Sequence, residues 1–349
     1  MATSIVGLDI GHGVLRAAEV SQGGKSQPKL LRYHEVTFPV DATREGEVLE
    51  ADVLVRAVRQ LWSQGKLRSK DVVLGIGNQR VLTRDLIVPR VPLDRIRETL
   101  PFQVQDLLPI PVADAVLDFY PIAESVSDAG PVINGLLVAA AKNAVLANVR
   151  AVQQAGLNPI DVDLIPFALS RALLRPQNAP GTVALVHVGA MTTCIVIARD
   201  GVPQFVRIIP SGGQDVTNAL MSTSGYTQAV AEETKASMGL IRDAFGDQVS
   251  PESEAVHRVT DELLTTIRAT LAFFTNTRPT TPVTRIVLSG GGARLKGFAT
   301  ALEESTRLPV DLGDPTDRFI VTRGVDDLSL ATGMPAMAVA LGLSLRSVA

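Results

Sequence analysis

The fold is decided by the stretch VGLDIGHG (residues 6–13), which is followed by an apolar run at residues 14–20. A related stretch, LVHVGAM (residues 185–191), is followed by a similar run at residues 193–198. Asp9 and His187 are 178 positions apart, which is close to half of the 349-residue chain. A repeat at this spacing predicts a twofold duplication in which both halves begin with the same structural unit.

Each copy predicts two strands joined by a glycine turn, because β-branched runs flank the glycines. Helices are predicted in both halves after these hairpins. Residues 53–62 carry apolar side chains at helical spacing, and we expect Asp52 to cap this helix. Residues 256–274 show the same spacing just before Pro279. Strand hairpins that alternate with helices predict an α/β fold.

A segment with a different pattern of predicted strands and helices lies between the halves, from about residue 83 to residue 166. Its patterns predict a strand at residues 86–89, a helical stripe at residues 93–107, and strands at residues 116–120 and 136–140. A second helix is predicted at residues 144–155, ending at Gly156. This order favours a small subdomain inserted into the first half. The alternative is that these strands and helices are additions to the edge of the main sheet.

The composition is that of a globular protein of two domains or one bilobal fold. Hydrophobic residues make up 46% of the chain, and 33 basic against 36 acidic side chains leave a net charge of −3. This balance lacks the basic excess of a nucleic-acid-binding protein. The single cysteine, Cys194, excludes an intramolecular disulfide. Without a signal sequence or an apolar run of about 18 to 20 residues, we expect a cytoplasmic protein that crosses no membrane.

The first hairpin has a pattern typical of phosphate binding, formed by Asp9, Gly11, His12, Gly13 and Arg16. Glycines let backbone N–H groups approach phosphate oxygens, a carboxylate at a strand end can order a hydrated cation, and a basic side chain offsets phosphate charge. The alternative is an ordinary tight hairpin with an exposed aspartate.

The second hairpin, with His187, Gly189 and Ala190, is expected to face the first across a cleft and to offer the N–H groups of Gly189 and Ala190 to the same phosphates. Its alternative is a buried strand end with a hydrogen-bonded histidine. The turn SGGGA (residues 289–293) follows an apolar strand and precedes a helix, where bare backbone can lie against a base or ribose. It is neither a Walker A loop nor a complete GxGxxG motif, so a flexible turn is its alternative.

Two phosphate-type hairpins in a duplicated chain, with a late triple glycine, resemble the superfamily of actin, the sugar kinases and the DnaK-type chaperones. The stretches SGG (residues 211–213) and AEETK (residues 231–235) are similar to the bacterial actin-like pattern. In that pattern the residues matching Glu232 and Lys235 approach the ribose. A charged pair on a solvated helix face is the alternative.

Within this superfamily the chain resembles the PilM family of type IV pilus assembly proteins over nearly its whole length. The resemblance is carried by PLDRI (92–96), DLLP (106–109), VLDF (116–119), PFA (166–168) and AVALGL (338–343). It implies a duplicated actin-like, ribonuclease H-like fold, with two lobes around a nucleotide cleft and an FtsA-like inserted subdomain. The implied subdomains are 1A (1–83, 167–180 and 326–349), 1C (84–166, the insertion), 2A (181–212 and 280–325) and 2B (213–279).

The resemblance also implies a cytoplasmic scaffold that binds ATP with Mg²⁺ and the N-terminal cytoplasmic segment of the membrane protein PilN. The peptide is expected at the junction of the insertion and the first half, which would hold the protein at the inner face of the membrane. Other inner-membrane pilus components and self-association fit the same resemblance. Asp9 is the expected metal ligand. The expected nucleotide-binding residues are Asp9, Gly11, His12, Gly13, Arg16, His187, Gly189, Ala190, Gly212, Gly213, Glu232, Lys235, Gly290, Gly291 and Gly292.

The chain departs from the family pattern at His187, where an aspartate is usual. A neutral imidazole should weaken metal binding and removes a candidate for positioning water, so we expect at most a weak ATPase in which ATP clamps the halves together. A sugar kinase is the first alternative, but it needs a carboxylate base in the cleft. An FtsA-like filament is the second, although residues 345–349 carry no basic amphipathic tail. The cytoplasmic part of a type II secretion protein is the third.

Overall fold

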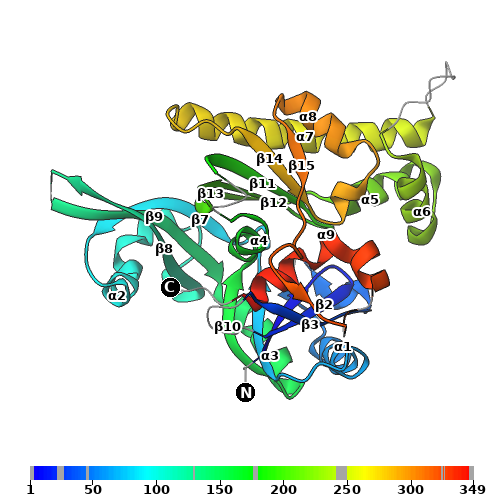
Figure 1. The fold of residues 1–349 in the computed structure, drawn as a ribbon, viewed down its shortest axis with the longest axis horizontal. Helices are drawn as coiled ribbons and strands as arrows, with labels where there is room; N and C mark the ends of the chain where they lie inside the picture. The colour runs from blue at the N-terminus through cyan, green and yellow to red at the C-terminus, as the bar shows by residue number, and fades with distance from the viewer. Residues whose placement is uncertain are drawn as a thin grey trace.

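Two mixed β-sheets with matching strand orders form the centres of two lobes (Figure 1). The structure is a computed structural model, and it describes residues 4–21, 27–44, 47–128, 130–175, 180–240, 250–323, 325 and 327–345. The first sheet has the order β10-β6-β1-β2-β3-β16, and the second has the order β13-β12-β11-β14-β15. Residues 346–349, on which part of the prediction about the C-terminal tail rests, lie outside the described residues.

Strand pairing confirms the predicted duplication. In each half the first strand pairs antiparallel with the second and parallel with a later strand, so β1, β2 and β6 correspond to β11, β12 and β14. The first sheet contains β1 (Ser4–Ile10), β2 (Val14–Ser21), β3 (Lys29–Thr37), β6 (Asp71–Ile76), β10 (Asn158–Leu164) and β16 (Ile320–Val321). The second contains β11 (Thr182–Val188), β12 (Thr193–Arg199), β13 (Val202–Ile209), β14 (Arg285–Ser289) and β15 (Val310–Leu312).

Helices cover both faces of the first sheet, because successive side chains of a strand point to opposite sides. From β1, Val6, Leu8 and Ile10 belong to a core that includes α1 (Ala51–Gln64) and α3 (Lys142–Gln154). On the other side, α4 (Ile165–Leu173) and α9 (Asp327–Ser344) lie between the two sheets (Figure 1). The core between the lobes is therefore continuous from one sheet to the other.

The helices of the second lobe form two groups. Helices α7 (Pro251–Thr277) and α8 (Phe298–Thr306) pack on the sheet, while α5 (Gly213–Ser224) and α6 (Gln228–Met238) pack with the first part of α7 in a separate cluster. The predicted helices at residues 53–62 and 256–274 are confirmed as α1 and α7. The predicted cap is wrong, because α1 begins at Ala51 and Asp52 lies in its first turn.

The insertion is a separate three-stranded sheet with one helix. Its strands are β7 (Leu82–Pro89), β8 (Ala115–Ser127) and β9 (Gly130–Ala141), in the order β7-β9-β8, and its helix is α2 (Leu93–Gln103). Val88, Ile96, Leu100, Phe119 and Leu137 are core residues of this unit. The far ends of β8 and β9 project from the molecule as an arm (Figure 1). An addition to the edge of the main sheet is not what the structure shows for this unit.

The predicted limit of the insertion at residue 166 is wrong. Strand β10 pairs in parallel with β6 of the first sheet, and α3 belongs to the same core as α1. The inserted unit therefore ends with β9, near residue 141, and the chain then returns to the first lobe. The other subdomain limits remain predictions.

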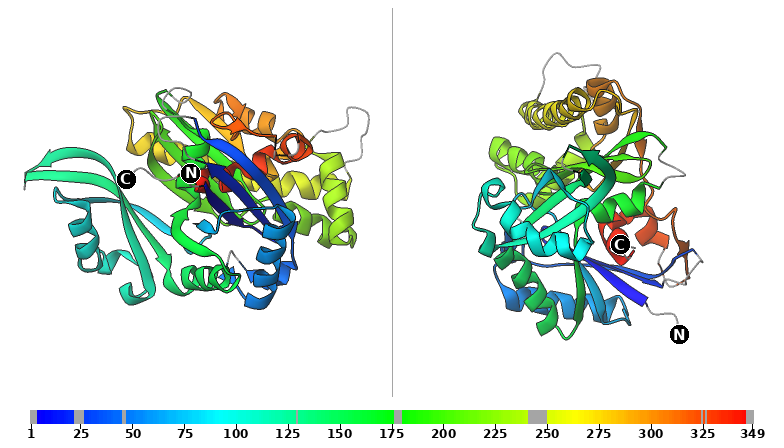
Figure 2. Two further views of the ribbon diagram at one scale, coloured as in Figure 1. Left: turned by 60° about the horizontal axis from the view of Figure 1, so that its bottom comes forward. Right: turned by 90° about the vertical axis from the view of Figure 1, so that its left-hand side faces the viewer.

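The insertion also contacts the second lobe, although the resemblance placed it on the first half. Thr83 on β7 donates a hydrogen bond from Oγ1 to the carbonyl oxygen of Val206 on β13, at 2.8 Å. Arg278, just after α7, forms a 2.6 Å ion pair with Asp85 on β7. Figure 2 shows this unit beside both lobes. It therefore bridges them.

Short elements complete the described chain. They are η1 (Val40–Ala42), β4 (Thr43–Arg44), β5 (Glu47–Val48), η2 (Gln105–Leu107), η3 (Val112–Asp114) and η4 (Gly292–Arg294). Among the described residues, none of the helices combines the length and the hydropathy that a membrane crossing requires.

Candidate functional site

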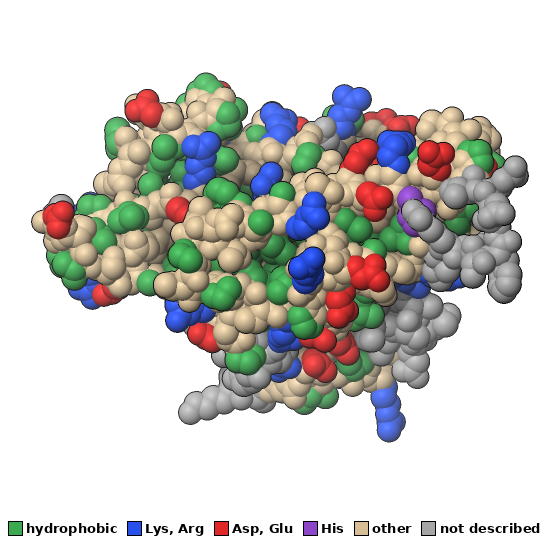
Figure 3. Space-filling model, turned by 90° about the horizontal axis from the view of Figure 1, so that it is seen from above, with side chains coloured by type: hydrophobic (Ala, Val, Ile, Leu, Met, Phe, Trp, Pro, Cys, Tyr) green, Lys and Arg blue, Asp and Glu red, His purple; other side chains and the backbone are tan. Residues whose placement is uncertain are grey.

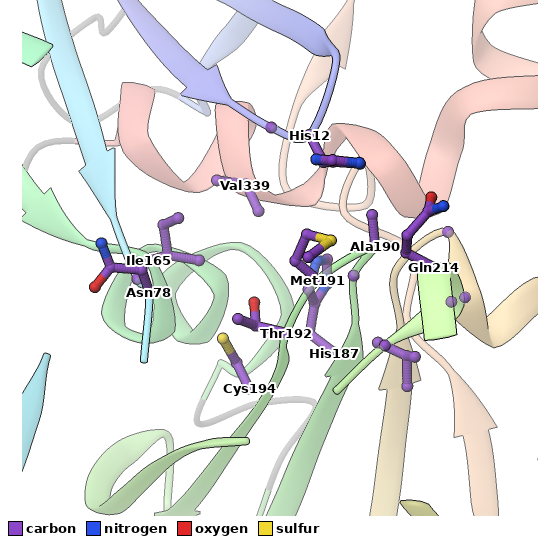
Figure 4. A pocket seen from close by; sticks show the side chains of 18 of the residues that line it. His12, Asn78, Ile165, His187, Ala190, Met191, Thr192, Cys194, Gln214 and Val339 are labelled. Carbon is purple, nitrogen blue, oxygen red and sulfur yellow. The ribbon is translucent and has the colours of Figure 1, made fainter. Parts of the chain in front are cut away.

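A cavity of about 790 Å³ lies between the lobes, and both duplicated hairpins line it. Figure 4 shows His12 on the first-lobe side of this cavity and His187, Ala190 and Met191 on the second-lobe side. The structure thus brings together most of the residues predicted for the site. Those that line the cavity are Asp9, Gly11, His12, Arg16, His187, Gly189, Ala190, Gly212, Gly213, Glu232, Lys235, Gly291 and Gly292.

Two predicted glycines lie outside the cavity wall. Gly13 has a φ of +68°, and a Cβ there would lie 2.7 Å from Cγ1 of Val40. Gly290 has a φ of +97°, and its Cβ would lie 2.2 Å from the carbonyl oxygen of Val188. Both positions require glycine for the path of the backbone, because a side chain would be strained and would collide. Neither residue lines the cavity, and their part in nucleotide binding stays a prediction.

The expected phosphate donor at Gly189 is also corrected. Its N–H donates to the carbonyl oxygen of Thr192 at 2.9 Å, just as the Gly11 N–H donates to Val14 at 2.9 Å. These bonds close the two hairpin turns. The N–H groups of the next residues, His12 and Ala190, have no backbone acceptor in the described part of the chain. They are the N–H groups that each turn leaves for a ligand.

Asp9 lies at the end of β1 opposite Arg16 on β2, and only 7% of its surface is exposed. The Arg16 Nη1 atom is 3.5 Å from Asp9 Oδ2, and the Arg16 Nε atom is 3.2 Å from Glu35 Oε2. Burial raises the pKa of Asp9, although the Arg16 guanidinium opposes this shift. Arg16 thus carries a positive charge at the cavity wall and shares it between two carboxylates.

His187 occupies the corresponding place in the second hairpin, where it pairs with Cys194 on β12. It is 8% exposed, and burial, assisted by the charge of Arg16, lowers its pKa to about 4. The imidazole is therefore neutral at pH 7. Its Nδ1 atom has no hydrogen-bond partner among the described residues, so the alternative of a hydrogen-bonded histidine does not describe this nitrogen. Burial also raises the pKa of the Cys194 thiol to about 12.

The hairpins offer a magnesium ion a single protein carboxylate. Mg²⁺ takes oxygen ligands in octahedral geometry and is commonly held by one or two carboxylates together with waters and phosphate oxygens, and Asp9, the carboxylate here, is already paired with Arg16. The second hairpin offers only the imidazole of His187. Within the described ranges, no three His, Cys, Asp or Glu side chains are grouped so that they could hold a metal ion.

A hydrogen-bonded network links Glu232 and Lys235 on α6 to α5. The Lys235 Nζ atom lies 2.7 Å from Glu232 Oε2 and donates to Thr217 Oγ1 at 2.7 Å, while Thr217 Oγ1 donates to Glu232 Oε1 at 2.6 Å. The Lys235 Nζ atom also donates to the carbonyl oxygen of Gly213 at 3.1 Å. Only 19% of the Lys235 side chain is exposed. The Glu232 side chain is 45% exposed, so Lys235 is the more buried member of a pair that lines the cavity wall.

Close backbone packing joins α5 to the second hairpin. The Gly213 N–H donates to the carbonyl oxygen of Gly189 at 2.9 Å. A Cβ on Gly212 would lie 2.5 Å from the carbonyl oxygens of both Gly189 and Ala190. Gly291, in contrast, faces open space, because no heavy atom lies within 4 Å of its Cβ position. Glycine here permits close packing at one position and bare backbone at the cavity wall at the other.

The sequence patterns did not mark several residues that line the same cavity. Asn78 follows β6, in the stretch GIGN (residues 75–78), and polar residues after a buried parallel strand are a signal that could have found it. Others have no local signal because distant packing brings them to the cavity. The unmarked residues include Thr43, Gly75, Asn78, Asn148, Ile165, Thr260 and Val339.

A family model described as type IV pilus assembly protein PilM matches residues 7–348. The chain belongs to the PilM family. A solved PilM-PilN type IV pilus biogenesis complex contains a similar chain, 27% identical, with full coverage of both chains and a TM-score of 0.85. These findings confirm the family resemblance seen in the sequence.

More distant relatives support the same fold. FtsA, the cell division protein of Pseudomonas aeruginosa, is 26% identical over 355 residues, covering 89% of this PilM-family chain and 83% of the relative. The structure of MreB5 of Spiroplasma citri bound to ADP is 13% identical, covers 97% and 94% of the two chains, and has a TM-score of 0.54. The predicted duplicated actin-like fold is confirmed.

Proposed function

We propose that this chain is an actin-like, ATP-binding scaffold of type IV pilus assembly that docks the N-terminal cytoplasmic segment of a PilN-type membrane protein. Family membership and the similarity to a chain of a PilM-PilN complex support the partner. The observation that supports nucleotide binding is that both hairpins and the Glu232–Lys235 network line one cavity.

The proposed nucleotide spans both lobes. Its phosphates lie between the two turns, where Arg16 and the N–H groups of His12 and Ala190 favour negative charge. Its ribose lies against Glu232 and Lys235. A ligand that touches both lobes stabilises their closed arrangement by mass action. ATP is therefore a clamp in this proposal.

Hydrolysis is a minor activity in the proposed function. Asp9 remains our proposed cation ligand, yet its pairing with Arg16 and the imidazole of His187 favour nucleotide binding with little dependence on Mg²⁺. No carboxylate from the second hairpin is present to position an attacking water. Rapid ATP turnover by the native chain that Asp9→Ala abolishes would contradict this view.

The partner segment is proposed to lie where the insertion meets the first lobe, in a groove that takes an extended or helical peptide. Binding there would hold the protein at the cytoplasmic face of the membrane through the partner's own membrane span. Residues 82–141 supply one side of this junction and the first lobe supplies the other.

The experiment is a calorimetric titration of the whole chain with a synthetic copy of the cytoplasmic start of the PilN-type protein, with and without ATP. A scrambled peptide of the same composition is the control. Saturable binding of the native peptide alone is expected. Equal heats from both peptides, in either nucleotide state, would overturn the partner assignment.

A further inference from the structure

A second cavity, of about 350 Å³, lies at the end of the second sheet that is opposite its hairpin turn. It is lined by Arg199 at the end of β12, Gln204 on β13, Phe274 in the last turn of α7, and Arg278 just after that helix. Figure 1 shows this end of α7 on the side of the insertion. Small ligands occupy cavities of about 300 Å³ and more, so this one has room for a small molecule.

The guanidinium of Arg278 is held in place from two sides. Its Cζ atom lies 4.9 Å from the centroid of the Phe274 ring, and its Nη2 atom lies 2.6 Å from Oδ2 of Asp85 on the insertion. Only 28% of the side chain is exposed. Its Nε and Nη1 atoms donate no hydrogen bond within the described part of the chain. They are preorganised donors, because a guanidinium that is already fixed loses little freedom when it binds a ligand.

Arg199 brings a second positive charge to the same cavity. Its Nε atom lies 3.9 Å from Oδ2 of Asp200, and this contact is weak because the two side chains are 59% and 63% exposed. Thr280 also lines the cavity, and its hydroxyl has no hydrogen-bond partner among the described residues. None of the described residues that line the cavity is an aspartate or a glutamate. This wall therefore carries two positive charges and no negative one.

The backbone carbonyl groups at the end of α7 would repel an anion if they were free. Those of Phe273 and Phe274 accept hydrogen bonds from the Thr277 hydroxyl, at 2.9 and 3.0 Å, and that of Phe274 also accepts from the Arg278 N–H at 2.9 Å. The carbonyl of Arg278 accepts from the N–H and the hydroxyl of Thr281, at 3.1 and 3.3 Å. These bonds offset much of the negative end of the helix.

We propose that this cavity binds the phosphate group of a small phosphorylated molecule, held between Arg199 and Arg278. A phosphate monoester carries about −1.5 to −2 charges at pH 7 and three acceptor oxygens, so it can bind both guanidiniums and the Thr280 hydroxyl at once. A carboxylate has one charge and two oxygens and uses these donors less fully. This site shares no residue with the cavity between the lobes, and the inference does not depend on the proposed ATP binding.

The phosphate would share Arg278 with the insertion. A phosphate on Nε and Nη1 leaves Nη2 for Asp85, but both anions then draw on one positive charge. Binding should therefore weaken the ion pair through which the insertion contacts the second lobe. Conversely, removal of the Asp85 charge should strengthen phosphate binding.

The test is a calorimetric titration of the whole chain with glycerol 3-phosphate at low ionic strength. Saturable binding is expected, and it should be about five- to tenfold weaker in Arg199→Gln and about two- to fivefold tighter in Asp85→Asn. Acetate should bind more weakly than glycerol 3-phosphate. Arg285→Gln is the matched control, because Arg285 lies on the same sheet, pairs with Asp311 at 2.8 Å and does not line this cavity. Its affinity should equal that of the native chain.

Four results would overturn the proposal. They are the absence of saturable binding, equal affinities of the native chain and Arg199→Gln, acetate that binds as tightly as glycerol 3-phosphate, and binding that Arg16→Gln abolishes but Arg199→Gln retains. The last would place the phosphate at the hairpins and leave the proposed ATP site untouched. Arg199 is 59% exposed and makes no described contact with the insertion, so its variant should fold. If it does not, Arg278→Gln gives the same comparison, and an unchanged affinity in that variant overturns the inference.

Discussion

Glu19 on β2 is a carboxylate whose surface is only 1% exposed, and four donors bind it. Ser4 Oγ and Arg32 Nη1 donate at 2.8 and 3.0 Å, and the backbone N–H groups of Arg68 and Ser69 donate at 3.1 and 3.2 Å. These donors come from β1, β3 and the loop before β6. A single side chain on β2 therefore ties β1 and β3 to the loop between α1 and β6.

We expect Glu19→Gln to lower the free energy of unfolding by about 2–3 kcal/mol, because an amide leaves buried donors without an acceptor. Burial alone would raise the pKa of Glu19, but hydrogen bonds from Arg68, Ser4 and Arg32 outweigh it and the pKa is lowered. The stabilisation is thus present above the carboxyl's ordinary pKa of 4.5 and is lost as the pH falls through the lowered value.

Urea unfolding at pH 7 and in acid measures this effect. The difference between the native chain and Glu19→Gln should shrink as the pH falls below 4.5. Glu124→Gln is the control, because Glu124 is 61% exposed and its ion pair with Arg90 contributes at most about 0–1 kcal/mol. Equal unfolding midpoints for both variants at pH 7 would contradict the structural role of Glu19.

His187 gives a second prediction at this scale, which concerns the cation. The ATP affinity of the native chain should change little when EDTA replaces Mg²⁺, because Arg16 already supplies positive charge beside Asp9. His187→Asp adds a carboxylate to the second hairpin and should make the affinity Mg²⁺-dependent. Calorimetry with and without EDTA measures both, and His187→Asn is the neutral control. A strong Mg²⁺ requirement in the native chain would contradict the prediction.

Residue types predicted many of the residues that line the cavity, but not which of their atoms are left to bind a ligand. The hairpin pattern marked Asp9 and Gly11, and the resemblance to the actin-like pattern marked Glu232 and Lys235; the structure places all four at the cavity. Spacing did not show that the N–H group of Gly189 closes its own turn. Thr260 had no sequence signal, because a threonine among apolar residues of a helix stripe looks like an ordinary core position.

Helix α9 lies unusually close to its neighbours at two glycines. A Cβ on Gly7 of β1 would lie 2.0 Å from the carbonyl oxygen of Ala340, and a Cβ on Gly342 of α9 would lie 2.0 Å from that of Ala168 on α4. Real Cβ atoms do not approach backbone atoms this closely. The close packing of α9 against β1 and α4 therefore requires glycine at positions 7 and 342.

We expect Gly342→Ala to lower the free energy of unfolding by about 1–3 kcal/mol or more, because an overpacked helix must move away from α4. Gly291→Ala is the matched control, since its Cβ meets no heavy atom within 4 Å and its φ is −64°. Chemical denaturation without nucleotide measures both variants. Equal stability of the two variants would show that α9 adapts to the added methyl group.

Most element types were predictable, but α3 and the segment that forms β10 were assigned to the wrong unit. Strand β10 contains Pro159, Asp161 and Asp163, and half of it faces solvent, so its sequence does not resemble a buried strand of the main sheet. Its pairing with β6 joins segments about 87 residues apart, as Asp71 and Asn158 show. Only the folded chain reveals such a pairing, and the limit of the insertion was therefore misplaced.

The two lobes share one core and one cavity, so a nucleotide should stabilise the whole molecule. Free ATP at 100 times its dissociation constant should raise the free energy of unfolding by about 2.7 kcal/mol. Thermal denaturation with and without ATP measures the shift. Lys235→Ala should reduce it at the same ATP concentration, whereas Lys70→Ala, an exposed lysine away from the cavity, should not. Equal shifts in both variants would argue against the cavity as the ATP site.

The duplication and the inserted unit were predicted from the sequence. Both follow from long-range features: the spacing of the repeat and the different element pattern of the segment between the halves. The face of the molecule seen in Figure 3 offers no comparable signal, since charged and apolar side chains are interspersed over it. The bridge between the insertion and the second lobe, through Asp85 and Arg278, appears only in three dimensions.

The projecting arm has a practical consequence when it is combined with the buried state of Cys194. Val126 on the arm is 82% exposed, while Cys194 is the sole thiol of the chain, is 2% exposed and has a pKa raised to about 12. Maleimide reagents attack thiolates, so Cys194 should stay unreacted in the folded protein. Val126→Cys would therefore accept one fluorophore at a defined position, and its emission would report when a tethered neighbour approaches the insertion.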